Sequence, residues 1–522
     1  MTVPRISRLL FSLAALCLIP LAAAAQLRLP KVWSDHAVIQ RDRPIHVWGW
    51  AGPGAEVSVR LHDSKGGDES GRAAADPLGR WSVYLAPHAA DGGQYTLAVS
   101  EGQMGGQSLL LRDLLMGDVW LASGQSNMEL PLLGFPGSAT LKNGTAEIKA
   151  ANHPEIRLLH EAKRFSEFPL ADQEATWQIC TPETASTFSA VAYFFGRTLQ
   201  EDQKVPIGLV EADWGGTPAE AWTSLEALSN PGLADVFAAR AHDMSSQVDA
   251  EAIQARNERE DAAAKAAGRT PEPHPWQPPP HPWQPASLYN GMIAPFTPLA
   301  IRGVLWYQGE ANTTFERAPL YHRLFCTMIS DWRQHFAQGD FPFLFAQISS
   351  FRSTPAEDWG MVRDAQRRTL SLASTGMAVT LDVGNPDNIH PADKQTVGYR
   401  LALAARALSY GERVAYTGPL FRQAITTSGG MRVYFNGADG RLKARTGALQ
   451  GFELAGADRH FVPATATIDG DGRSVTITSS AVATPQYVRY AWANAPEATL
   501  EDSAGLPAST FTSEAVPALP MR

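Results

Sequence analysis

Residues 117–128 read GDVWLASGQSNM, an apolar run that passes directly into small and polar residues. This pattern is typical of a buried strand followed by a loop. Further short apolar runs alternate with helical stretches up to about residue 410, and they lie at 156–160, 207–212, 303–306, 343–347 and 377–381. Strand–helix alternation predicts a parallel sheet with helices on both faces. Because ligand sites of such sheets lie beyond the carboxyl ends of the strands, we expect Ser126 at the mouth of a site.

The regions on either side of residues 113–410 have β-type patterns. Residues 26–112 contain alternating runs such as WSVYL and YTLAV, separated by Gly, Pro and Asp turns, which is typical of a β-sandwich. Residues 411–522 return to short apolar runs between turn residues and predict a second β-rich domain. A chain of 522 residues is also too long for a single core. The sequence therefore predicts three domains with these bounds.

The first 25 residues have the features of an export signal. Arg5 and Arg8 give a basic start, and the apolar run at 9–21 is too short to span a bilayer comfortably. Residues 22–25 are four alanines, which suit cleavage after Ala25. This predicts a periplasmic or extracellular protein that has no membrane anchor once the signal is removed.

Composition limits the classes of partner. The formal net charge is −9 and no block of Lys or Arg occurs, so nucleic acid and anionic membranes are excluded as partners. Only Cys180 and Cys326 remain after signal removal, and they either form one disulfide or stay as two free thiols. The oligomeric state has no signal in the sequence.

An insertion at about 248–286 interrupts the α/β pattern. It starts with an Ala-, Glu- and Lys-rich segment of helical character and continues with HPWQP, which occurs twice. Proline at this density favours an extended chain. We expect a surface insertion or linker; the alternative is that Trp276 and Trp283 border a sugar-binding cleft.

Two segments carry residues suited to acyl transfer. Ser126 follows the first strand, but Met128 replaces the second glycine of the G-x-S-x-G motif, which argues against an ordinary α/β-hydrolase. Asp387 lies three residues before His390 in a predicted loop, from which a carboxylate can reach the imidazole and fix its tautomer. The structural alternatives are that Ser126 is a turn residue and that His390 only caps a helix.

Two further strand ends carry candidate oxyanion donors. Gly215 and Gly216 follow one strand, where a backbone N–H can approach a ligand closely. Gln308, Glu310 and Asn312 follow another strand. Acyl transfer needs two or three donors aimed at the developing oxyanion. The alternatives are a simple turn for the glycines and a structural hydrogen-bond network for the three polar residues.

Several of these motifs, in this order, resemble those of sialate O-acetylesterases and related carbohydrate acetylesterases of the SGNH hydrolase superfamily. The resemblance covers about residues 113–410 and is carried by GDVWLASGQSNM, ADWGGTPAEAW, LYNGMIAPF, GVLWYQGEAN and DNIHPADKQTVGYRLA. The flanking VWGWAGPGAEV and YVRYAWAN also look like accessory β-regions of this family. The fold that the resemblance implies is α/β, an SGNH-type three-layer sandwich with a parallel central sheet, flanked by jelly-roll-like β-sandwich regions.

The resemblance also implies roles for individual residues. Ser126 is expected to be the nucleophile, His390 the general base and acid, and Asp387 the carboxylate that orients it. The oxyanion hole would combine the Ser126 amide, an amide of Gly215 or Gly216, and the Gln308 side chain. Two supporting candidates remain, Glu310 and Asn312.

The expected activity is removal of O-acetyl groups from a glycan without a metal or another cofactor. The substrate is expected to be an acetylated plant polysaccharide or oligosaccharide, such as xyloglucan or xylan, or an O-acetyl sialic acid. One alternative is a non-catalytic carbohydrate-binding protein with a degenerate hydrolase core. Another is a glycoside hydrolase that uses paired carboxylates such as Glu310 and Asp382.

Overall fold

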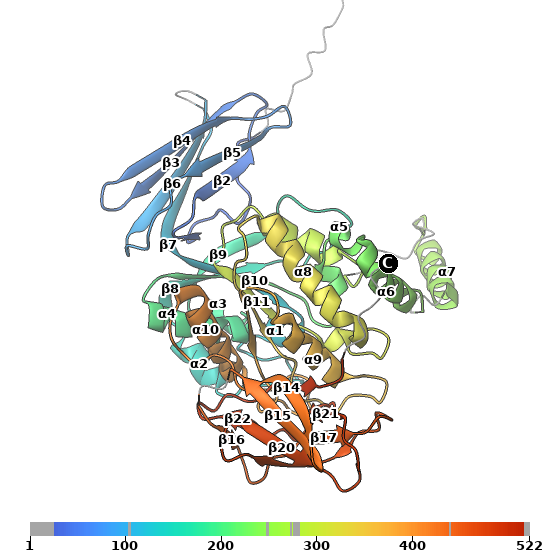
Figure 1. Cartoon of the computed structure of the whole chain (residues 1–522). Coiled ribbons are helices and arrows are strands. Elements are labelled where there is room, and N and C mark those ends of the chain that lie inside the picture. The colour runs from blue at the N-terminus through green and yellow to red at the C-terminus, as the bar shows by residue number, and fades with distance from the viewer. Residues whose placement is uncertain are drawn as a thin grey trace, which may run out of the picture.

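The chain folds into a central α/β part with a β-rich part at either end (Figure 1). The computed structural model describes residues 26–102, 106–246, 250–271, 274, 282–437 and 440–515. The predicted export signal and Trp276 lie outside the described residues.

The central sheet contains all six strands that the apolar runs predicted. Its order, from one edge to the other, is β13 (Thr375–Ala378), β12 (Phe343–Ala346), β11 (Gly303–Tyr307), β7 (Ser108–Gly124), β10 (Ile207–Asp213), β8 (His153–Glu161) and β9 (Ala175–Cys180). The six strands from β13 to β8 pair in parallel, and β9 adds an antiparallel edge. β7 comes first along the chain yet lies in the middle, so the strand order reverses beside it and a ligand site is expected there.

Helices cover both faces of this sheet. Along β11, the Trp306 ring packs in one core, where its centroid lies 5.8 Å from that of Trp332 on α8 (Tyr321–Phe336), and α9 (Trp359–Thr369) belongs to the same side. Leu305 and Tyr307 belong to the core on the opposite face, together with residues of α4 (Ala190–Gln203) and α10 (Lys394–Tyr410). These alternating burial directions give the layered arrangement that strand–helix alternation predicted.

The N-terminal β-part continues directly into the central sheet through β7. The first residues of β7 alternate between exposed and half-buried, whereas its last eleven are all buried. Its first half pairs with β1 (Val38–Gln40) and β6 (Gln94–Glu101), and β3 (Glu56–Asp63) and β4 (Asp68–Ala74) extend this sheet; β2 (Ile45–Trp50) pairs separately with β5 (Arg80–Leu85). The predicted domain boundary between 112 and 113 thus falls inside one continuous strand.

The C-terminal β-part consists of short antiparallel sheets. Their orders are β14 (Leu420–Thr427), β15 (Gly430–Asn436), β20 (Ser474–Thr478), β19 (Thr465–Ile468); β18 (Val462–Pro463), β17 (Phe452–Ala455), β21 (Tyr487–Tyr490), β23 (Phe511–Thr512); and β16 (Leu442–Ala444) with β22 (Leu500–Asp502). The fully buried Arg363 of α9 donates to the carbonyl of Ala491 at 3.0 Å and to Oγ1 of Thr510 at 3.0 Å. A buried cation satisfied in this way fixes the C-terminal part to the central one.

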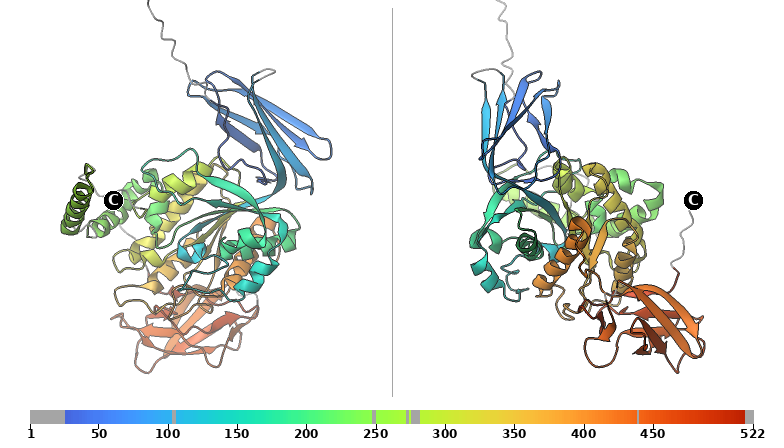
Figure 2. Two further views of the ribbon diagram at one scale, coloured as in Figure 1. Left: turned by 180° about the vertical axis from the view of Figure 1, so that it is seen from behind. Right: turned by 60° about the vertical axis from the view of Figure 1, so that its left-hand side comes forward.

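The remaining helices and helical turns belong mostly to the segments that connect the strands, around the sheet (Figure 2). They are α1 (Ser126–Glu129), α2 (Gly144–Ala150), α3 (Pro182–Ser186), α5 (Leu225–Leu228), α6 (Ala234–Ser246), α7 (Ala250–Ala266), a π-helix η3 (Tyr289–Ile293) and the 3₁₀ turns η1 (Ala219–Trp222), η2 (Pro231–Leu233), η4 (Ala294–Phe296), η5 (Glu310–Asn312) and η6 (Ala318–Leu320). The predicted helix of the insertion is therefore present as α7.

Cys180 and Cys326 are both free thiols, so of the two alternatives the disulfide is not formed. Burial raises the pKa of Cys180 to about 12, which makes it an unreactive core residue. In the part of the chain that the structure describes, every helix is too short or too polar to cross a bilayer.

Candidate active site

The turn after β7 places Ser126 at the carboxyl edge of the sheet. Gly124 has φ of +143°, and a Cβ at this position would lie 2.2 Å from the carbonyl oxygen of Tyr307 on the neighbouring strand, so only glycine fits. Gln125 is buried, and its Oε1 accepts the backbone N–H of Ala311 at 3.2 Å. Ser126 then opens α1 and is half-buried, whereas its neighbours Gln125 and Asn127 are buried. The chain therefore presents one serine at the surface of an otherwise buried turn.

A hydrogen bond joins the serine turn to the predicted histidine loop. The Nδ2 of Asn127 donates to the carbonyl of Ile389 at 3.0 Å, across 262 residues of sequence. Asn127 follows Ser126 and Ile389 precedes His390, so the backbones that carry the two predicted catalytic residues lie side by side. The structure thus brings Ser126 and His390 into one region at the carboxyl ends of the strands.

The ring of His390 is held in a partly apolar environment. It lies edge-on to Phe135, with 5.3 Å between the ring centroids. Burial lowers the pKa of His390, and the nearby Lys394 lowers it further, whereas Glu129 raises it. A histidine in these surroundings stays neutral near pH 7, which is the state that can accept a proton from a serine.

Buried hydrogen bonds connect the serine turn to two charged side chains. The Nζ of Lys394 donates to Oδ1 of Asn127 at 2.5 Å, and Nδ2 of Asn127 donates to Oε1 of Glu310 at 2.6 Å. Burial lowers the pKa of Lys394 to about 7 and raises that of Glu310. Glu310 therefore binds a side chain of the serine turn, and its supporting role in the reaction stays a prediction. Sequence reasoning did not single out Asn127 and Lys394, although both lie in the quoted motifs.

Asp387 lies elsewhere in the conformation described. Its side chain is 73% exposed and forms an ion pair with Arg352. Among the described residues, no hydrogen bond joins Asp387 to the ring of His390, and the carboxylate that acts on the pKa of His390 is that of Glu129. Asn388, next in the chain, accepts the backbone N–H of His390 at 2.9 Å. The orienting role of Asp387 stays a prediction.

The two glycines after β10 lie against the serine turn. A Cβ at Gly215 would lie 3.3 Å from Cβ of Ser126, and the N–H of Gly215 donates to Oε2 of Glu129 at 2.5 Å. Gly216 has φ of +74°, and its Cβ position lies 3.5 Å from the ring of Trp283. Trp283 therefore borders the loop of the predicted oxyanion donors, and a sugar-binding role for it stays a prediction.

The Gln308 side chain is part of a buried network. Its Nε2 donates to the carbonyl of Thr217 at 3.2 Å and to Oδ1 of Asn312 at 2.7 Å, and its Oε1 accepts from the Tyr321 hydroxyl at 2.9 Å. Asn312 in turn donates to Oε2 of Glu220 at 2.9 Å. Both amide protons of Gln308 are therefore in use, and this network braces the loop that carries the two glycines. This matches the structural alternative for Gln308 and Asn312.

Comparison with known proteins identifies the family. The sequence matches the family described as carbohydrate esterase, sialic acid-specific acetylesterase, over residues 116–253 and 265–407. It is 30% identical to the sialate O-acetylesterase of Rattus norvegicus over 507 residues, which cover 89% of this chain and 90% of that protein. It is 32% identical to the sialate O-acetylesterase of Homo sapiens over 411 residues, which cover 72% of this chain and 69% of that protein.

A solved structure extends the similarity to nearly the whole fold. A carbohydrate acetylesterase from Xanthomonas citri is 37% identical and superposes with a TM-score of 0.78, covering 94% of this chain and 99% of that chain. The mixed α/β sheet with additional β-sheet regions at both ends is therefore consistent with a carbohydrate esterase fold. The chain belongs to the sialic acid-specific acetylesterase family of carbohydrate esterases, and it is a carboxylic ester hydrolase.

Proposed function

We propose that this protein is a serine esterase that removes O-acetyl groups from carbohydrate, with Ser126 as the nucleophile and His390 as the general base and acid. The observation that carries the proposal is the hydrogen bond from Asn127 to the carbonyl of Ile389, because it joins the residue after Ser126 to the residue before His390. The family membership supports ester hydrolysis, and the names of the relatives support an acetylated sugar as substrate.

The proposed reaction has two halves. In the first, Oγ of Ser126 attacks the acetyl carbonyl carbon while His390 takes the hydroxyl proton, and the sugar oxygen then leaves with that proton. In the second, His390 takes a proton from water while the resulting hydroxide attacks the acetyl-serine, and His390 then returns this proton to Oγ of Ser126 as the ester bond to the serine breaks and acetic acid leaves. The lowered pKa of His390 supports this role because the reaction starts from neutral imidazole.

In this proposal the main oxyanion donors are backbone amides. The N–H groups of Ser126 and Gly216 are the natural pair, while that of Gly215 becomes available when Glu129 moves away from it. Gln308 contributes a third donor only by giving up its bond to Thr217 or Asn312. Similarly, Asp387 orients His390 only by leaving Arg352.

The proposed substrates are acetylated plant polysaccharides or their oligosaccharides, such as xyloglucan or xylan, and O-acetyl sialic acids. We also propose that residues 1–25 are an export signal and that the protein acts in the periplasm or outside the cell. The domain bounds 26–112, 113–410 and 411–522, an SGNH-type central domain and jelly-roll-like flanking regions are part of the same proposal.

The test is acetate release from a panel of acetylated glycans. Ser126→Ala and His390→Ala should each lose nearly all activity on every substrate that the wild-type protein deacetylates, whereas the exposed Ser108→Ala on β7 should match the wild-type protein. Retained activity in Ser126→Ala would refute the nucleophile assignment. Absence of release from every glycan, with hydrolysis of p-nitrophenyl acetate intact, would refute the carbohydrate assignment alone.

The two alternatives make distinct predictions. A non-catalytic sugar-binding protein would bind glycans but resist labelling by a serine-directed organophosphorus reagent. A glycoside hydrolase would need Glu310 and Asp382 free, yet Glu310 accepts from Asn127 and Asp382 forms a bidentate ion pair with Arg400, with both distances 2.7 Å. The esterase proposal is therefore the one that these contacts favour.

A further inference from the structure

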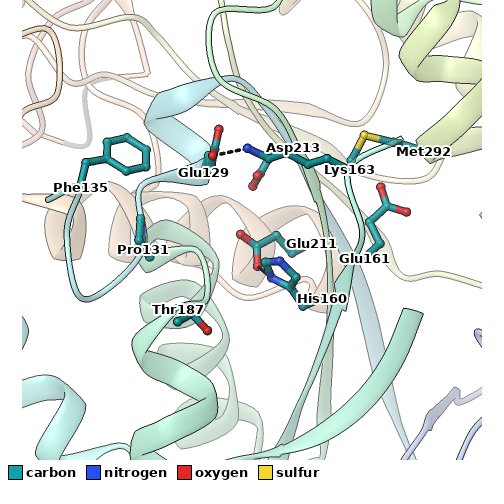
Figure 3. Close-up of a pocket in the computed structure, with 10 residues that line it drawn as sticks. All are labelled: Glu129, Pro131, Phe135, His160, Glu161, Lys163, Thr187, Glu211, Asp213 and Met292. Carbon is teal, nitrogen blue, oxygen red and sulfur yellow. Dashed lines mark hydrogen bonds and ion pairs between the residues drawn. The ribbon is translucent and has the colours of Figure 1, made fainter. Parts of the chain in front are cut away.

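Figure 3 shows the residues that line a pocket of about 210 Å³. Glu129 lies on α1 with Ser126, and the Phe135 ring packs against His390, so two of the pocket's lining residues also contact the catalytic region. The full lining is Glu129, Pro131, Phe135, His160, Glu161, Lys163, Thr187, Glu211, Asp213 and Met292. A sugar whose acetyl group reaches Ser126 can thus extend into this pocket.

Three buried carboxyl groups at the ends of β8 and β10 dominate the lining. Glu161, Glu211 and Asp213 are 3%, 4% and 5% exposed. Glu211 accepts from Nδ1 of His160 at 2.9 Å. By contrast, both carboxyl oxygens of Glu161 and Oδ2 of Asp213 are buried without a hydrogen-bond partner in the described part of the chain.

Unpartnered buried carboxyl groups destabilise a fold unless something else binds them. Burial raises the pKa of Glu161 and of Asp213 well above the ordinary carboxyl range. The neighbouring Asp213 raises the pKa of Glu161 further, and Glu211 raises that of Asp213 further. Both shifts favour the uncharged, protonated form of these groups. A protonated carboxyl group both donates and accepts a hydrogen bond, which matches the hydroxyl groups of a sugar.

The cations of the pocket already have anionic partners. Lys163 forms an ion pair with Glu129, and His160 is bonded to Glu211, which raises the pKa of His160. A sugar carboxylate entering this pocket would meet further carboxyl groups and would have to displace one of them from its cation. Burying an uncompensated carboxylate is strongly unfavourable.

We propose that this pocket is a subsite for an uncharged, hydroxyl-bearing sugar unit of the substrate, bound by the carboxyl groups of Glu161 and Asp213, and that it selects against sugar acids. The inference rests on the proposed function, because it names the substrate class at the same site. It favours neutral acetylated oligosaccharides over O-acetyl sialic acid.

The test measures specificity, binding and stability in the full-length protein. Acetate release from a neutral acetylated xylo-oligosaccharide is compared with hydrolysis of p-nitrophenyl acetate, for the wild-type protein, Glu161→Leu, Glu161→Gln and the exposed control Glu167→Leu. Glu161→Leu should lower the ratio of kcat/KM for the oligosaccharide to that for the small ester by about tenfold or more, mainly through KM. Glu161→Gln, which keeps hydrogen-bonding atoms, should restore part of the ratio, and Glu167→Leu should leave it unchanged.

Stability separates a binding role from a structural one. Because neither carboxyl oxygen of Glu161 has a hydrogen-bond partner among the described residues, Glu161→Leu should keep or raise Tm while oligosaccharide hydrolysis falls. A lower Tm with equal losses on both substrates would make Glu161 structural and overturn the proposal. A ratio that stays unchanged, or a wild-type preference for O-acetyl sialic acid over the neutral oligosaccharide, would also overturn it. Added Ca²⁺ or Mg²⁺ that raises Tm in the wild-type protein but not in Glu161→Gln would replace the sugar subsite with a cation site.

Binding distinguishes failure of this inference from failure of the proposed function. In the Ser126→Ala background, calorimetry with the deacetylated neutral oligosaccharide should detect binding that Glu161→Leu weakens about tenfold. Binding that depends on Glu161, in a protein that deacetylates no glycan, would retain the subsite and refute the esterase assignment on glycans. Catalysis on glycans with binding independent of Glu161 would do the reverse.

Discussion

Replacing Lys394 tests whether burial lowers the pKa of the lysine that binds the serine turn through Asn127. Burial lowers the pKa of Lys394 from an ordinary value of 10.5 to about 7. Between these pH values the unfolded state binds the proton more tightly than the folded state, so stability rises as the pH rises. Each pH unit in this window is worth about 1.4 kcal/mol. Raising the pH from 7.5 to 9.5 should therefore stabilise the wild-type protein by about 2.5 kcal/mol relative to Lys394→Met.

The assay is urea unfolding followed by tryptophan fluorescence at several pH values between 7.5 and 9.5. Groups that titrate identically in both proteins cancel in the difference, and the exposed Lys149→Met on α2 serves as the matched control. The control should show a difference from the wild-type protein that does not change with pH. A pH-independent difference for Lys394→Met as well would refute the reasoning, because the lysine would then have kept its ordinary pKa in the fold.

Further predictions concern the turn and the histidine. Gly124→Ala should destabilise the protein by about 3 kcal/mol or more, measured by urea unfolding, because its Cβ would lie 2.2 Å from the carbonyl oxygen of Tyr307; a loss below 1 kcal/mol would mean that the strands separate easily. Asp387→Asn should lower kcat/KM by less than about tenfold, since the carboxylate pairs with Arg352, whereas an essential orienting carboxylate would cost about 10⁴-fold. Activity should fall on acidification only below pH 6.5, where His390 gains its proton, and Lys394→Met should move that fall to higher pH because the lysine lowers the pKa of His390; a profile that does not move in the variant would contradict this electrostatic link.

Local sequence patterns predicted the elements that depend on local physics. The apolar runs became the strands of the central sheet. The same parallel-sheet reasoning placed Ser126 and Gly215 at one edge, where a Cβ on the glycine would lie 3.3 Å from that of the serine.

These local patterns could not show which distant residues would take the hydrogen-bonding groups of the predicted site. The spacing of Asp387 and His390 allows a hydrogen bond, but Arg352, from a distant segment, pairs with the carboxylate instead. Gln308 follows a strand as an oxyanion donor would, but its amide protons are taken by Thr217 and Asn312. Such contacts depend on which distant segments of the chain pack together, and the spacing within one segment does not specify this.

The acidic pocket was missed for a related reason. Glu161, Glu211 and Asp213 lie in apolar strand ends, where a carboxylate is expected to turn toward solvent. The signal that could have found them is the presence of three acidic residues at the carboxyl ends of strands that pair in the sheet. Only the register between β8 and β10, in which His160 lies opposite Glu211, brings them together.

Mass-spectrometric mapping of a serine-directed organophosphorus label tests most directly whether one activated serine performs the chemistry. The wild-type protein should carry one label, on Ser126, and lose esterase activity in proportion to labelling, while His390→Ala should label at a rate lower by orders of magnitude. A label on a different serine, or full activity after Ser126 has been completely modified, would contradict the account.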